Sequence, residues 1–357
     1  MKVNGVFAGV VLCAFGLFAA SGVRAQVTRE GLDAVGLRLQ AAQSFYNKLS
    51  PQQQKMLSGS ALNFFHVVKE WPELQGRALQ IQKALGSGQL PSANVSSQLS
   101  LTDVPTTLSP VRVSNPATDF KYGLSGGFTQ SETSSAWCGT HVVVGFNDSG
   151  SFWQSGFATN GANLSVNGFA LSTTTGTTTY KDEGYLPANV SGSAVNFLLG
   201  DPVLACTSTL NFYYSSLLQS TSAIGAPLSD ISVSLSTNGG TSFGAPIIAV
   251  AKNGRTHFLD KDWMAVNPAN PSQIAMTYTD FDSSGSICGF TNGLANLRVA
   301  IELVGSANGG ATWSAPTVLN QQCNRPRLPS RIFSVGSGQC GLRAVLSGPS
   351  DRASNSV

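Results

Sequence analysis

Apolar residues near the beginning of the chain recur at intervals of three and four, which is the spacing of one face of an α-helix. The first stripe consists of Leu32, Val35, Leu39, Ala42, Phe45 and Leu49. Ser50 and Pro51 then supply an N-cap and a first helical residue, and a second stripe follows over residues 57–68. Pro72 is expected to start a further short helix. Residues 26–88 are therefore predicted to form an α-helical hairpin, which either packs against the rest of the protein or serves as a pro-region.

The pattern changes after this helical region. Residues 89–118 are rich in Ser, Thr, Pro and Val, and we expect them to form a linker. From residue 119 onward, short apolar runs alternate with Gly, Ser, Thr and Asn, as is typical of β-strands joined by turns. The pattern predicts a mainly β protein with an α-helical hairpin at its N-terminal end.

One turn sequence recurs in the β region. Its first complete copy consists of Ser236, Asn238, Gly240 and Phe243, its second of Ser306, Asn308, Gly310 and Trp313, and a degenerate earlier copy contains Ser172 and Gly176. In such a turn the hydroxyl and the amide accept hydrogen bonds from backbone N–H groups, and the glycine adopts a positive φ. The aromatic side chain is expected to pack back onto its own sheet. These roles are structural, and we favour them over ligand binding.

A second marker has the same period as the turns but a different phase. Aromatic-rich strands are predicted at residues 142–148, 212–216 and 274–280, and they place Phe146, Tyr214 and Tyr278 at comparable positions. A repeat of this length holds about four short strands with their turns. The two markers together predict three copies of one four-stranded sheet.

The repeated turn resembles the Asp box, also called the BNR repeat, of sialidases and their non-catalytic relatives. The resemblance covers about residues 136–320, although both complete copies have Asn where the Asp box has Asp. It implies a partial sialidase-like β-propeller of about three blades over residues 119–322. Closed propellers have at least four blades. We therefore expect a truncated member of the family, with an irregular tail at residues 323–357.

The resemblance also indicates which catalytic groups to look for. Sialidases use a Tyr nucleophile assisted by a Glu, an Asp acid/base and three arginines that bind the sugar carboxylate. No Tyr–Glu pair can be carried over onto this sequence, and only Arg255 and Arg298 lie within the repeats. The remaining catalytic candidates are weak, and turn capping is the favoured alternative for the acids among them. These candidates are Asp201, Asp260, Asp262 and Arg255.

Charge and targeting signals change the picture in two ways. Lys2, the apolar residues 6–20 and the small residues before position 25 are typical of a signal peptide, and this apolar run is too short to span a membrane. Residues 1–25 are therefore expected to be removed, leaving a secreted or periplasmic protein without a membrane span. No cluster of Lys and Arg occurs before residue 325. Nucleic-acid binding is excluded on that ground.

The cysteines form no CxxC pair, so neither a metal site nor a cofactor is predicted. One or two disulfides are expected in an oxidising compartment, and Cys288 with Cys323 is the nearest pair before the tail. Buried free thiols are an equally open interpretation for Cys138 and Cys206. The sequence thus predicts a secreted Asp-box propeller that binds glycans or cell-surface proteins, with an exo-sialidase-type glycoside hydrolase as the alternative.

Overall fold

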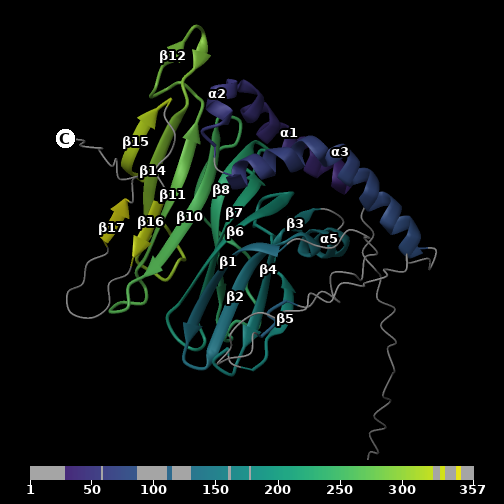
Figure 1. The fold of residues 1–357 in the computed structure, drawn as a ribbon, viewed down its shortest axis with the longest axis vertical. Coiled ribbons are helices and arrows are strands. Elements are labelled where there is room, and N and C mark those ends of the chain that lie inside the picture. The colour runs from purple at the N-terminus through teal and green to yellow at the C-terminus, as the bar shows by residue number, and fades with distance from the viewer. Residues whose placement is uncertain are drawn as a thin grey trace, which may run out of the picture.

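The computed structural model describes residues 29–57, 59–86, 111–114, 130–159, 162–176, 178–324, 330–333 and 343–346. The predicted signal peptide at residues 1–25 lies outside the described residues, as does all of the predicted linker except residues 111–114. The described part is mainly β, as the sequence predicted, with helices at its N-terminal end (Figure 1).

The helical region contains α1 (Arg29–Lys48), the single turn α2 (Pro51–Gln54) and α3 (Gly59–Gly86). Ser50 caps α2 as expected, because its Oγ accepts from the Gln53 backbone N–H while Gln53 Oε1 accepts from the Ser50 backbone N–H. The expected break at Pro72 is absent, since this residue lies inside α3. Proline has a helical φ and removes only one backbone hydrogen bond, while Trp71 before it is buried and Leu79 after it is partly buried against the same core.

The helical hairpin packs against the β region, as the first of its two interpretations predicted. Phe64 and Phe65 stack around Phe258, with ring centroids 5.4 and 4.9 Å away, and Phe45 lies 6.2 Å from the same ring. Residues of both helices share one core with Phe281 and Val299 of the β region. Figure 1 shows α1 and α3 crossing one end of the strands.

Each of the three predicted repeats contributes four antiparallel strands to one sheet, and the second sheet has a fifth strand. The first sheet contains β1 (Gln130–Cys138), β2 (His141–Asp148), β4 (Asn167–Ser172) and β5 (Lys181–Tyr185). The second contains β6 (Asn196–Cys206), β7 (Phe212–Thr221), β8 (Pro227–Ser236) and β9 (Ile247–Asn253), with the short β3 (Asn163–Ser165) parallel to β6. The third contains β10 (His257–Val266), β11 (Ile274–Asp282), β14 (Arg298–Ser306) and β15 (Thr317–Cys323).

The first strand of each sheet lies against the sheet next to it. Strand β6 contacts β1 and β2, and β10 contacts β6, β7 and β8. Two apolar cores result, one between the first and second sheets around Phe169 and Tyr214, and one between the second and third around Ile231 and Tyr278. We call β1, β6 and β10 the inner strands.

The loops carry further elements. Helix α5 (Ser149–Ala158) follows β2, and Asp148 caps it by accepting from the backbone N–H groups of Gly150 and Ser151. The hairpin of β12 (Phe290–Thr291) and β13 (Leu294–Ala295) projects between β11 and β14. The sequence predicted an irregular tail without a further strand, but β16 (Ser330–Phe333) and β17 (Arg343–Leu346) form a hairpin there, and β16 lies against β10 and β11. Runs of only four residues between Pro, Ser and Gly were too short to show a strand pattern.

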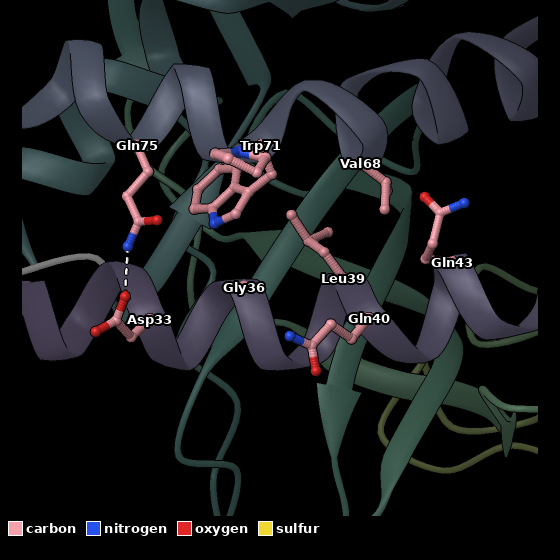
Figure 2. A pocket seen from close by; sticks show the side chains of 9 residues that line it. Asp33, Gly36, Leu39, Gln40, Gln43, Val68, Trp71 and Gln75 are labelled. Carbon is pink, nitrogen blue, oxygen red and sulfur yellow. Dashed lines mark hydrogen bonds between the residues drawn. The ribbon is translucent and has the colours of Figure 1, made fainter.

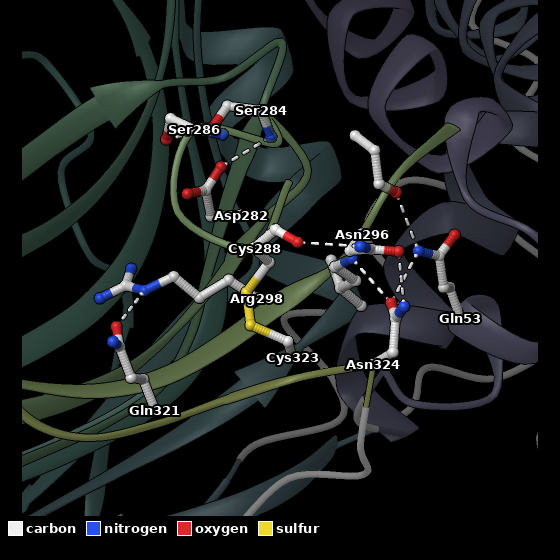
Figure 3. The surroundings of a disulfide bond; sticks show 12 residues. Gln53, Asp282, Ser284, Ser286, Cys288, Asn296, Arg298, Gln321, Cys323 and Asn324 are labelled. Atoms are coloured by element: carbon white, nitrogen blue, oxygen red, sulfur yellow. Dashed lines mark hydrogen bonds between the residues drawn. A yellow bond between two sulfur atoms is a disulfide. The ribbon is translucent and has the colours of Figure 1, made fainter. Parts of the chain in front are cut away.

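Two disulfides join described cysteines. Cys288–Cys323 fixes the loop after β11 to the end of β15, as expected from their proximity in the sequence (Figure 3). Cys138–Cys206 joins the ends of inner strands β1 and β6, so the free-thiol interpretation of these two residues is wrong. Their separation of 68 residues equals the distance between Phe146 and Tyr214, which places both cysteines at the same position in successive repeats. Two disulfides fit an extracellular or periplasmic protein.

Candidate functional site

Each inner strand is interrupted by a β-bulge, and one residue in each bulge has a left-handed backbone. These residues are Glu132 in β1, Asp201 in β6 and Lys261 in β10, with φ angles of 50°, 53° and 52°. A positive φ is uncommon for residues with a side chain, and it costs roughly 1–2 kcal/mol. The same conformation therefore occurs at the bulge of all three inner strands.

The three bulge side chains meet at one point, which we call the axial cluster. Lys261 Nζ lies 2.8 Å from Asp201 Oδ2 and 3.2 Å from Glu132 Oε1. The side chains of Lys261 and Glu132 are each 36% exposed, whereas that of Asp201 is 6% exposed. Each of the three sheets therefore contributes one charged side chain to the cluster, and two of these three side chains are partly exposed to solvent.

Asn147 of β2 holds two members of the cluster in place. Its Nδ2 donates to Glu132 Oε2 at 2.7 Å, and its Oδ1 accepts from the Asp201 backbone N–H at 2.9 Å. Gly200 is required beside it, because its φ is +102° and an added Cβ would lie 2.4 Å from Asn147 Oδ1. The bulge of β6 is thus built around the Asn147 amide.

Burial changes the protonation of the cluster. Burial is the main cause that raises the pKa of Asp201 well above its usual range, and a hydrogen bond with Glu132 and the charge of Asp260 act in the same direction. Burial lowers the pKa of Lys261, but the carboxylates of Asp201 and Asp260 outweigh it and raise that pKa overall. Burial thus favours the protonated form of Asp201, whereas the neighbouring carboxylates favour the charged form of Lys261.

The structure brings together three of the four catalytic candidates. Asp260 and Asp262 flank Lys261 on β10 and are both buried, and Asp262 turns toward the second sheet, where it accepts a short hydrogen bond from Ser215 Oγ. Burial raises the pKa of Asp262 to about 7. Arg255 lies elsewhere, exposed in the turn before β10, where its backbone N–H donates to Asn253 Oδ1.

The repeated turns have the geometry that the sequence predicted. Ser236 Oγ accepts from the Gly240 backbone N–H at 2.9 Å, and Asn238 Oδ1 accepts from the Ser242 backbone N–H at 3.1 Å. The turn of residues 306–313 repeats both bonds at 2.9 Å, from Gly310 to Ser306 and from Thr312 to Asn308.

The degenerate turn keeps part of this pattern. Ser172 Oγ accepts from the Gly176 backbone N–H at 3.2 Å, and Thr174 Oγ1 replaces the Asn amide in a hydrogen bond to Thr178 Oγ1. The turn therefore forms without the Asn side chain.

The aromatic residue of the first complete turn packs against two sheets. Phe243 makes edge contacts with Phe169 of the first sheet and Tyr214 of the second, with ring centroids 5.1 and 5.7 Å away. Gly240 lies against Val143 of β2 so closely that an added Cβ would be 2.3 Å from its Cγ2. The turn of one sheet therefore locks onto the sheet before it, at the end of the strands away from the helices.

A second charged network lies buried between the second and third sheets. Arg298 donates to Asp280 and Glu302 at 3.0 Å each, and Lys252 of β9 contacts the same two carboxylates at 2.7 and 2.5 Å. Tyr278 OH donates to Glu302 Oε2 at 2.7 Å. Burial alone would raise the pKa of Glu302, but the hydrogen bonds from Lys252 and Tyr278 lower it overall.

This network contains the Tyr–Glu pair that sequence reasoning did not find. Strand alternation was the available signal, because Tyr278 and Asp280 share one face of β11, Arg298 and Glu302 share one face of β14, and Tyr278 pairs directly with Glu302. Tyr278 is fully buried and Glu302 is 2% exposed. Lys252 of β9 links this buried pair of the third sheet to the second sheet.

The described ranges contain neither a metal-binding cluster nor a helical membrane span. No group of three or more His, Cys, Asp or Glu side chains there is arranged to hold a metal ion. None of the helices in those ranges is long and apolar enough to cross a membrane.

Comparison with known proteins assigns no family to the chain. No family model and no curated protein matches it. Among solved structures, it is similar to an α-L-arabinofuranosidase from Fusarium graminearum (8% identity, TM-score 0.36, covering 57% of this chain and 52% of that one). It is also similar to a polysaccharide lyase that acts as an ulvan lyase (11%, 0.32, 58% and 44%) and to a Hadza microbial sialidase (10%, 0.28, 62% and 51%).

The chain spans about half the length of these carbohydrate-active enzymes. At these identities and TM-scores the likeness assigns no activity to the chain.

Proposed function

We propose that this protein is an exported, sialidase-like Asp-box β-propeller protein that binds neutral carbohydrate at the axial cluster. In this proposal the three sheets are propeller blades and the inner strands line their axis. The observation that carries the proposal is the convergence of Glu132, Asp201 and Lys261 from three equivalent left-handed bulges. The repeated turns support the family, because they have the hydrogen bonds expected of Asp boxes.

The chemistry of the cluster suits sugar hydroxyl groups. Glu132 offers an exposed acceptor and Lys261 an exposed donor, and they lie 3.2 Å apart. A sugar hydroxyl donates to the first and accepts from the second, as pairs of neighbouring hydroxyls on one ring can do together. Asp201 and Asn147 lie behind this pair and fix its geometry.

The charge of the cluster argues against sialic acid. Four carboxyl groups, those of Glu132, Asp201, Asp260 and Asp262, interact with the single Lys261 ammonium. Even with Asp201 protonated, the cluster has no net positive charge to attract a sugar carboxylate. Arg255 lies in an exposed turn and Arg298 is bound in the buried network, so neither takes part. Neutral sugars are therefore the favoured ligands.

Titration calorimetry tests the proposal. The probes are methyl α-L-arabinofuranoside, methyl β-D-xyloside and sialyllactose, with purified wild-type protein and the Glu132→Gln variant. We expect a neutral glycoside to bind and Glu132→Gln to weaken it about tenfold, because one charged hydrogen bond is lost. Glu70→Gln is the matched control, since Glu70 is exposed on α3 in an ion pair with His66. The proposal would be contradicted if no neutral glycoside bound, or if Glu132→Gln bound the glycoside as tightly as the wild-type protein.

A glycoside hydrolase is the second candidate, and one observation favours it. Asp201 and Glu132 converge on the Lys261 ammonium, and burial raises the pKa of Asp201, which is the direction that suits a general acid next to a carboxylate base. Fluorogenic arabinofuranoside, xyloside and sialoside substrates separate the two candidates. Turnover that is lost in Asp201→Asn supports the hydrolase, because Asn keeps the shape and tolerates the left-handed backbone but carries no proton to donate. Binding without turnover supports a binding protein.

A further inference from the structure

A cavity lies between helices α1 and α3, and none of the residues that line it belongs to the axial cluster (Figure 2). Its volume is about 440 Å³, within the range of small-molecule sites. Leu39, Val68 and Trp71 form its apolar wall, and amide side chains line its edge. No Lys or Arg is among the residues that line it.

One polar group in the wall of this cavity lacks a partner. Trp71 is 5% exposed and its Nε1 has no hydrogen-bond partner. Figure 2 shows the indole between the two helices with its nitrogen toward α1. The nitrogen lies above Gly36, where an added Cβ would be only 3.1 Å away. A buried unpaired N–H is unfavourable by roughly 1–3 kcal/mol, which an acceptor supplied by a ligand would recover.

Pro72 provides an acceptor beside this donor. Proline has no N–H, so the backbone carbonyl of Val68, four residues earlier in α3, loses its usual helical partner. Val68, Trp71 and Pro72 all line the cavity. An unpaired donor and an acceptor without its helical bond thus occur within one turn, and a single hydroxyl group can accept from the first and donate to the second.

We propose that the cavity between α1 and α3 binds a neutral, hydroxyl-rich small ligand, such as a sugar or polyol, through the Trp71 indole N–H. The apolar face of the ligand packs on Leu39 and Val68, and its hydroxyls reach Gln40, Gln43 and Gln75. Gly36 and Trp71 both line the cavity, and the absence of a side chain at Gly36 leaves the space beside the indole nitrogen open. The Asp33–Gln75 hydrogen bond, 2.5 Å long and exposed, closes one end.

The site does not depend on the axial cluster. Trp71 is held from behind by an edge contact with Phe152 of α5, 5.9 Å between ring centroids. Neither Glu132 nor Asp201 lines this cavity, so the variants Glu132→Gln and Asp201→Asn test the axial cluster separately from it.

Nuclear magnetic resonance of the indole N–H groups tests the proposal directly. The protein has five tryptophans, and the Trp71 signal is identified by its absence from the Trp71→Phe variant. The probes are maltose, methyl β-D-glucopyranoside and glycerol, with glucuronate as an anionic comparison. We expect at least one neutral probe to shift the Trp71 signal, and glucuronate to bind more weakly.

Two glycine variants provide a matched pair. Gly36→Ala places a methyl group between the helices at the indole nitrogen, and should weaken binding of the neutral probe about tenfold, the equivalent of one hydrogen bond. Gly76→Ala makes the same change on α3, where nothing lies within 4 Å of the added Cβ, and should leave binding unchanged. Alanine favours helix over glycine in both variants, which offsets part of the crowding against Trp71 in Gly36→Ala.

Three results would overturn the inference. They are the absence of any shift of the Trp71 signal with the neutral probes, full binding by Gly36→Ala, and equal weakening by the two glycine variants. The first would mean that Gly36 serves only to let Trp71 pack closely against α1.

Discussion

Replacing Gly240 by alanine tests whether the repeated turn locks two sheets together. Gly240 has a φ of +86°, and an added Cβ would lie 2.3 Å from Val143 Cγ2. Val143 is completely buried and β-branched, so its side chain cannot move aside easily. Gly192 has a similar φ of +79° but nothing within 4 Å of an added Cβ. Gly192→Ala therefore measures the backbone strain alone.

The expected difference between these variants follows from two contributions. Left-handed strain destabilises both by roughly 1–2 kcal/mol. Overpacking adds about 1–3 kcal/mol in Gly240→Ala only. Unfolding in urea should show this difference, and the Tm of Gly240→Ala should be lower by about 2–4 °C per additional kcal/mol. Equal losses in the two variants would show that the turn does not pack on the first sheet, and the arrangement of the sheets would have to be revised.

Three further predictions concern stability. Burial raises the pKa of Asp262 to about 7. The native state therefore binds a proton at this carboxyl more tightly than the unfolded chain does. The free energy of unfolding should fall as the pH rises from about 4 to 7. Urea titrations at several pH values should show a flatter profile for Asp262→Asn, and identical profiles would contradict the assignment. Replacing Cys138 and Cys206 together by serine opens a loop of 68 residues. Denaturant unfolding should show a loss of about 4 kcal/mol in the free energy of unfolding. A loss below about 1 kcal/mol would mean that the disulfide does not constrain the unfolded chain. Phe258→Ala removes the ring on which Phe45, Phe64 and Phe65 pack. The variant should lose about 3–5 kcal/mol of the free energy of unfolding, and limited proteolysis within residues 29–86 should become faster. Unchanged cleavage would show that other contacts hold the helices.

Repetition made the sheets predictable. The turns at residues 236–243 and 306–313 and the aromatic strands shared one period, so each repeat could be assigned four strands before any contact was known. The same period placed Cys138 and Cys206 at equivalent positions, but equivalence alone did not show that successive inner strands lie side by side. Pairing between copies depends on how the sheets pack, and a period carries no information about that.

The axial cluster was only partly predictable. Asp201, Asp260 and Asp262 were selected as acids ahead of apolar strands, and they do lie on inner strands. Glu132 and Lys261 were missed, because the bulges that turn them toward Asp201 break the two-residue alternation of their strands. Arg255 was selected only for its proximity in sequence to Asp260, and the chain turns between them. The Trp71 cavity left no signal in the sequence, since it depends on how α1 crosses α3.

A crystal structure of the protein grown with the neutral glycoside that binds best would test the central claim most directly. We predict electron density for a sugar whose hydroxyls contact Glu132 and Lys261, with the three left-handed bulges unchanged. A sugar bound at neither residue, while the Glu132–Lys261–Asp201 contacts remain intact, would show that the cluster only ties three sheets together.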